Sequence, residues 1–221
     1  MIKRIKSVDY LMLISILLIV SIIVNICMLF KLNNYKYKIG QQSYIKIEDV
    51  KQKNQTDIDI LLKSIEEGSI KNEELLKLYK NYDAISSDVM ELWQQYGSYT
   101  QNETPMFSKN IKTNKVIEND IHGKIKEYIL STLNREMKDE KSTLQLQGED
   151  LQSFKAMYEI SSEIDDYFNE FNKEKLNGVI GEKREIRVIK EHYWIDMLEG
   201  IYDVSDNYGD LQWKIQAVDI D

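Results

Sequence analysis

The residue types best suited to chemistry occur together in one segment, KEHYWIDMLEG, which spans residues 190–200. His192 and Asp196 are four residues apart, so a helix would place them on one face, with Glu199 on the same side. An imidazole with two carboxylates is a ligand set that can hold a metal ion such as zinc. This segment is therefore the candidate metal site of the chain.

A structural interpretation of the same segment is favoured over the metal site. In it, the three polar residues form the edge of a helix whose buried side carries Tyr193 and Met197. The other histidine, His122, follows Glu118 by four residues. To add a ligand to this metal site, His122 would have to lie beside His192 in the folded chain, and nothing in the sequence requires that. No metal-ligating residue is therefore predicted.

Two further metal patterns fail on single positions. Di-iron bundles need a glutamate three residues before each of two histidines, but Asn119 and Ile189 occupy those positions. The segment DVSDNYGD would begin a calcium loop at Asp203, yet Tyr208 and Lys214 stand where glycine and glutamate are needed. A turn rich in carboxylates is the simpler interpretation of that segment.

Motifs of nucleotide-binding and hydrolytic enzymes are missing. The sequence contains neither G-x-x-x-x-G-K-[ST] nor G-x-G-x-x-G, and no nucleophile elbow surrounds a serine. The neighbours Asp165 and Asp166 point to different sides of a helix, so they cannot act as an acid–base pair. The apolar surroundings of Cys27 disfavour its thiolate. We therefore predict no catalytic residue, no cofactor-binding residue and no enzymatic activity.

Two sets of aromatic residues can serve either a ligand groove or a core, and core packing is favoured for both. The first set is a stripe at helical spacing within residues 150–176: Phe154, Tyr158, Phe168 and Phe171. The second set comprises the three tryptophans: Trp93, Trp194 and Trp213.

Charge is divided unevenly along the chain of 221 residues, whose net charge is −8. The first 40 residues contain six basic residues and one acidic residue, so the remainder is strongly acidic. Nucleic-acid binding depends on neutralising phosphates with basic side chains. A nucleic-acid partner is therefore not expected.

A run of twenty uncharged residues, from Leu11 to Phe30, predicts a membrane anchor. As a helix it is about 30 Å long, the thickness of the hydrocarbon core of a bilayer. A cleaved signal peptide has a shorter apolar region and a small-x-small exit, which is missing here. A lipoprotein signal would need a small residue before Cys27, where Ile26 stands. The lipid bilayer is thus a predicted partner through Leu11 to Phe30.

The orientation of this anchor is less strongly determined, because three basic residues precede the run and three follow it closely. Moving the N-terminal cations outward would oppose the membrane potential, while a long acidic domain translocates with little regard to its charge. We expect a single-pass protein of the cell membrane, with a short cytoplasmic N-terminus at residues 1–10 and the C-terminal domain outside.

The remaining sequence predicts an all-α fold, in which the transmembrane helix precedes an antiparallel bundle of four to five helices. A juxtamembrane segment at 31–46, read as continued helix or a short linker, leads to a bundle domain at 47–200 and a C-terminal tail at 201–221. The tail has turn residues around 207–210, and its end is expected to be a short strand or disordered. The expected helices cover these ranges: 47–67, 72–96, 110–139, 150–176 and 181–200.

The helix at 72–96 has the clearest pattern, a strict heptad seam. Its seam residues are as follows: Leu75, Leu78, Tyr82, Ile85, Val89, Leu92 and Tyr96. About three heptads are short for a homo-oligomeric coiled coil, so packing within the chain is favoured and a homo-oligomer stays possible.

Several local details are also predicted. Asn72 is expected to cap its helix, and Gly68 and Gly97 to end theirs. The Pro-containing segment 98–108 is expected to be a loop, and the alternation LQLQ within 139–148 to be extended. In the helix expected at 110–139, these residues are expected to face inward: Ile117, Ile121, Ile125, Tyr128, Leu133 and Met137. In the helix expected at 181–200, the inward residues are Ile186, Ile189, Tyr193 and Met197.

These features predict a non-enzymatic protein-interaction or scaffold module held at the cell surface, with a protein partner of unknown identity. The alternative is an extracytoplasmic small-ligand sensor. Since only about ten residues would remain inside, such a sensor would have to act through a partner in the membrane.

Overall fold

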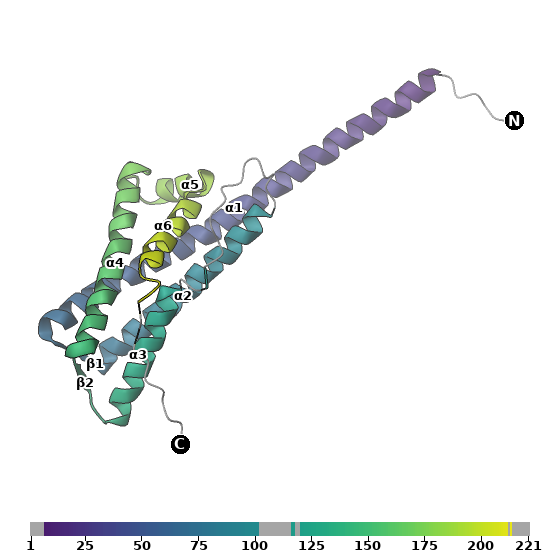
Figure 1. The fold of residues 1–221 in the computed structure, drawn as a ribbon. Helices are drawn as coiled ribbons and strands as arrows, with labels where there is room; N and C mark the ends of the chain where they lie inside the picture. The colour runs from purple at the N-terminus through teal and green to yellow at the C-terminus, as the bar shows by residue number, and fades with distance from the viewer. Residues whose placement is uncertain (1–6, 102–115, 118–119, 212, 214–221) are drawn as a thin grey trace. The chain divides into compact units, whose positions relative to one another are not determined.

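The computed structural model describes residues 7–101, 116–117, 120–211 and 213, and is almost entirely helical (Figure 1). Within these residues its elements are α1 (Ser7–Glu67), β1 (Ser69–Lys71), α2 (Asn72–Thr100), α3 (Ile121–Lys138), β2 (Thr143–Gln145), α4 (Gly148–Glu174), α5 (Glu182–Lys190) and α6 (Tyr193–Asn207). The predicted all-α class is confirmed.

The chain divides into two compact units, Met1–Ile39 and Gly40–Asp221, and α1 contributes to both. In the first unit, α1 contains an 18-residue window with a mean hydropathy of 2.9, of which 0% is buried. Length and composition make it a candidate membrane span, a test that a signal sequence near an N-terminus also passes. The segment 31–46, expected as continued helix or linker, is helical.

In the second unit, α1 and α2 run antiparallel, as polar contacts along their length show. Lys46 Nζ lies 2.7 Å from Asp88 Oδ1, and Lys63 Nζ lies 2.9 Å from Glu74 Oε1. Residue numbers therefore rise along α1 as they fall along α2. The seam predicted for α2 is buried along its whole length within the chain.

The other helices pack on this pair. Ser86 Oγ of α2 donates to Asp120 Oδ2, 2.9 Å away, at the start of α3. Arg184 of α5 is buried and forms an ion pair with Glu48 of α1, while its guanidinium lies 5.6 Å from the ring centre of Tyr44. Cross-helix contacts thus hold α3 to α2 and α5 to α1.

A two-stranded antiparallel ladder joins the α1–α2 connection to the α3–α4 connection. Ile70 of β1 pairs with Leu144 of β2, and both side chains are buried. A hydrogen bond of 2.9 Å from Leu146 N to Gly68 O extends the ladder. Gly68 has φ +66, which glycine adopts readily, so it ends α1 as predicted. The extended LQLQ segment is confirmed at Leu144 and Gln145.

Helix α2 begins at Asn72, as predicted, but the predicted N-cap residue and the predicted C-terminal end are both wrong. The N-cap is Lys71, without a side-chain cap hydrogen bond, whereas the Asn72 side chain donates to Lys141 O at 2.7 Å. Gly97 lies inside the helix, which runs on to Thr100, into the predicted loop at 98–108. Buried Tyr99, beyond this glycine, supplies tertiary packing that outweighs the glycine's low helix propensity. The remainder of the predicted loop, 102–108, lies outside the described residues.

Three residues expected to face inward are exposed: Ile117 by 84%, Met137 by 63% and Ile186 by 36%. Ile117 precedes α3, which begins at Ile121. Its side chain is therefore not placed on the buried face by the regular spacing of that helix. The predicted helix start at 110 lies outside the described residues. Met137 belongs to the last turn of α3, in which the buried side chain is that of Glu136.

The single helix predicted at 181–200 is also wrong, because it breaks into α5 and α6. His192 separates them with φ 57 and ψ 25, in the left-handed region that non-glycine residues seldom adopt. The second helix then continues beyond Gly200 to Asn207, into the segment predicted as a tail. The short strand considered for residues 214–221 lies outside the described residues.

Candidate functional site

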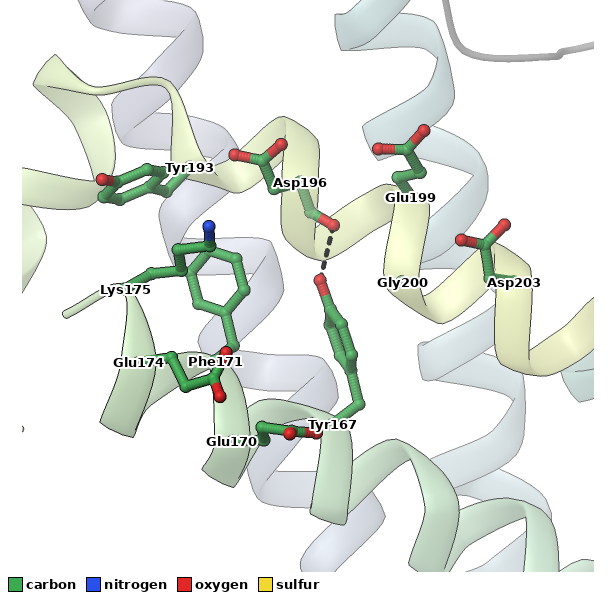
Figure 2. Close-up of a pocket in the computed structure, with 10 residues that line it drawn as sticks. All are labelled: Tyr167, Glu170, Phe171, Glu174, Lys175, Tyr193, Asp196, Glu199, Gly200 and Asp203. Atoms are coloured by element: carbon green, nitrogen blue, oxygen red, sulfur yellow. Dashed lines mark hydrogen bonds between the residues drawn. The ribbon is translucent and has the colours of Figure 1, made fainter.

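A cleft of about 360 Å³ opens between the last three turns of α4 and the helix α6 (Figure 2). The two helices run antiparallel, since Tyr167 of α4 contacts Asp196 while Tyr208, after α6, contacts Glu163. The Tyr167 hydroxyl donates a hydrogen bond of 2.7 Å to the backbone carbonyl of Asp196. This bond closes the inner side of the cleft and fixes the Tyr167 ring across it.

A glycine makes this position of Tyr167 possible. A Cβ atom on Gly200 would lie 1.9 Å from Tyr167 Cζ, far inside the range of real contacts. The ring therefore rests directly on the backbone of α6. The predicted helix at 181–200 ends at Gly200. In the structure this glycine lies inside α6, and its missing side chain leaves the space that the Tyr167 ring occupies.

Replacing Gly200 with Ala is expected to lower the free energy of unfolding by about 1–3 kcal/mol, because the methyl group must expel the Tyr167 ring. This loss exceeds the gain of about 1 kcal/mol that alanine brings to a helix. Urea unfolding of the full chain in detergent micelles measures the change.

Gly97→Ala is the matched control, since it is also helical and a Cβ there would meet nothing within 4 Å. We expect that variant to gain about 0.5–1 kcal/mol. Stabilisation by both substitutions would contradict the tight seat of Tyr167.

Aromatic rings form the floor of the cleft. The ring centres of Tyr167 and Phe171 are 6.0 Å apart, and those of Phe171 and Tyr193 are 5.6 Å apart at an interplanar angle of 83°. Phe171 is buried, as predicted for the aromatic stripe of this helix. The two tyrosines that accompany it are half-buried and were not predicted as site residues. The spacing of four between Tyr167 and Phe171 is the signal that marks the first of them.

Carboxylates form both walls of the cleft. Glu170 and Glu174 stand four residues apart on α4, and Asp196, Glu199 and Asp203 follow one face of α6. Burial raises the pKa of the Tyr167 hydroxyl, and the three carboxylates of α6 raise that pKa further. The hydroxyl therefore stays protonated and acts as a hydrogen-bond donor.

One cation lies among these acids. Lys175 caps the C-terminus of α4 and lines the cleft, and it makes no ion pair with any described residue. Its ammonium points from α4 toward the α6 side of the cleft (Figure 2). A cation near an aromatic face gains about 0.5–2 kcal/mol, and nearby carboxylates add to that attraction. The cleft is thus suited to positive charge.

The three candidate metal ligands do not come together. The break at His192 turns its ring onto Tyr99 of α2, with ring centres 5.3 Å apart, whereas Asp196 and Glu199 line the cleft. In the part of the chain that the structure describes, no three His, Cys, Asp or Glu residues are placed to hold a metal ion.

The two histidines also lie apart. His122 stacks on Tyr82, with ring centres 6.1 Å apart, while the ring of His192 lies on Tyr99. Those two tyrosines are separated by about 25 Å along α2, at 1.5 Å per residue. Glu118, the neighbour considered for His122, lies outside the described residues.

Two buried titratable groups lie in the core beside Tyr82. Asp57 is fully buried and accepts a hydrogen bond of 2.6 Å from Asn81 Nδ2, and burial raises its pKa to about 8. His122 is also buried, and neither ring nitrogen has a hydrogen-bond partner among the described residues. Burial lowers the pKa of His122 to about 4. Both groups are therefore neutral near pH 7, and neither reaches solvent.

Comparison with known proteins finds no match to a family model, to a curated protein or to a solved structure. The chemistry of the cleft is therefore inferred from its own lining. The described residues that line it are aromatic, acidic and basic side chains and one glycine.

Proposed function

We propose that this chain is a non-enzymatic interaction module, anchored in the cell membrane, that binds a protein partner at the cleft between α4 and α6. The observation that carries the proposal is the lining of that cleft, an aromatic floor between two walls of carboxylates. Aromatic rings supply much of the binding energy at protein interfaces, and charge steers the partner.

The membrane part of the proposal rests on the apolar stretch of α1. Residues 11–30 would form the single span, with the N-terminus in the cytoplasm and the bundle outside the cell. Protease added to intact cells is then expected to remove residues 40–221. Complete protection of the bundle would place it inside and overturn this orientation.

A small-ligand sensor is the second candidate, favoured by the size of the cleft. Its volume of about 360 Å³ lies in the range of small-molecule pockets, roughly 300–1,000 Å³. Such pockets are usually enclosed and mostly apolar, however, whereas this cleft is open and carries five carboxylates. The charged, open lining therefore favours a protein partner.

A photo-crosslinking residue at Glu174, on the wall of the cleft, tests the binding site in intact membranes. We expect one discrete protein to be captured from this position, and mass spectrometry to place the crosslink in a segment of that protein. The control position is Lys80, which is exposed on α2 and does not line the cleft. Equal capture from both positions, or none from Glu174, would contradict the proposal.

A further inference from the structure

The composition of the cleft restricts the chemistry of its ligand, an inference that rests on the proposed function. We propose that the cleft between α4 and α6 receives a lysine side chain from the partner protein. The ligand then places an ammonium among the five carboxylates and lays its aliphatic stem along the aromatic floor. An uncharged or acidic side chain of the same length would lack the positive charge that carboxylates attract.

The first support is the match between charge and shape. Acids stand on both walls, Glu170 and Glu174 on α4 and Asp196, Glu199 and Asp203 on α6, so a cation in the cleft is attracted from two sides. Between them, the rings of Tyr167, Phe171 and Tyr193 offer the apolar and π surface that a lysine stem and ammonium use.

The second support is a lysine of the chain itself. The Lys175 side chain lines the same cleft, with its ammonium toward the α6 wall, and forms no ion pair with any described residue. It therefore occupies part of the space, and carries the charge, that a partner's lysine would bring. Lys175 thus competes with a partner's lysine for the carboxylates of the cleft. The ligand must displace the Lys175 side chain or share the cleft with it.

The position of Lys175 allows a test in which removing a charge from the cleft strengthens binding. Lys175→Met removes the competing charge and keeps most of the side-chain volume, so binding of a cationic ligand is expected to become at least fivefold tighter. Lys173→Met is the matched control, because it makes the same change two residues away on an exposed position outside the cleft. We expect that control to stay within twofold of the unchanged protein.

The probe is a short glycine-rich peptide with one lysine, compared with the same peptide containing norleucine. Binding is measured by calorimetry on the full chain in lipid nanodiscs of uncharged lipid. The lysine peptide should bind, with an affinity that falls as salt is raised, and the norleucine peptide should bind at least tenfold more weakly. Glu174→Gln should weaken the lysine peptide about threefold or more.

Two results would overturn the inference. One is equal binding of the lysine and norleucine peptides, and the other is the same affinity for Lys175→Met and Lys173→Met. Either failure leaves the crosslinking at Glu174 unaffected, so a partner that binds by other chemistry would still be detected. Conversely, loss of the crosslink with intact lysine binding would reject the protein-partner function alone.

Discussion

Asp57→Asn is expected to stabilise the protein by about 4 kcal/mol at pH 7. Burial raises the pKa of this carboxyl from 3.8 to about 8. The folded protein therefore keeps a proton that the unfolded chain loses. Asparagine has nearly the same shape, can accept the hydrogen bond from Asn81, and does not ionise.

The sign of this effect sets its pH dependence. A raised pKa in the folded state means that the contribution of Asp57 to stability is complete below about pH 4. It is lost as pH rises toward 8. The advantage of Asp57→Asn over the unchanged protein should grow from about 2 kcal/mol at pH 5 to about 6 kcal/mol at pH 9. Urea unfolding in micelles, followed by tryptophan fluorescence at several pH values, measures this difference.

His122 has the opposite pH dependence. Because burial lowers its pKa from 6.5 to about 4, the unfolded chain binds a proton first on acidification. Stability is then lost as pH falls from about 6.5 to about 4, by about 3 kcal/mol in all. This loss affects the Asp57→Asn variant and the unchanged protein equally, so it cancels in their difference. From about pH 4 to 6.5 the two effects have opposite signs and nearly cancel, so the combined contribution of the two groups is flat there and falls as pH rises from about 6.5 to 8.

Asp59→Asn is the control for the Asp57 experiment, since Asp59 lies two residues further along α1 and is exposed. Its effect should stay within about 0.5 kcal/mol at every pH. If the gain from Asp57→Asn did not change between pH 5 and pH 9, the carboxyl would not be held in its protonated form.

Trp194→Ala is expected to cost about 3–5 kcal/mol, the largest loss from one truncation in this core. Trp194 is fully buried at the start of α6, and its ring centre lies 5.6 Å from that of Tyr99 in α2. A Cβ on Gly40 of α1 would lie 3.6 Å from its Nε1 atom. One side chain therefore fills the space where α1, α2 and α6 meet, and its removal leaves a large cavity.

Trp194→Phe is the matched variant for this test. It keeps an aromatic ring and removes the indole N–H, which has no hydrogen-bond partner among the described residues. The loss should therefore be below about 2 kcal/mol. Chemical unfolding followed by circular dichroism at the helical band compares the two. Similar losses for Ala and Phe would show that the indole does not fill the meeting point of the three helices.

Structural features that follow from an apolar pattern repeated over several helical turns could be predicted from the sequence. The seam of α2, from Leu75 to Tyr96, repeats an apolar residue at steps of three and four, and every member is buried. A long amphipathic helix must bury its apolar face, so this pattern determines the element and its inner side. For the same reason the all-α class and the burial of Phe154, Phe168 and Phe171 in α4 were predicted correctly.

Features that depend on one residue, or on a partner far away in the sequence, could not be predicted from the sequence. The break at His192 needs the left-handed backbone conformation, which only a few per cent of non-glycine residues adopt, so no local pattern predicts it. Once that break was missed, the face shared by His192 and Asp196 was placed wrongly. The seat of Tyr167 on Gly200 joins two helices across 33 positions of the chain, and a glycine in a helix signals equally well an end, a kink or a close contact.

The small ladder between β1 and β2 has a consequence for the order of events during folding. Ile70 and Leu144 pair across a long loop of chain, whose closure carries an entropic cost that local helix formation does not. Helices α2 and α3, a closely packed pair among the described helices, can pack before the ladder joins the two connections. Contacts made after the rate-limiting barrier mainly slow unfolding. We therefore expect the ladder to form late, so that changes at Ile70 or Leu144 alter the unfolding rate more than the folding rate.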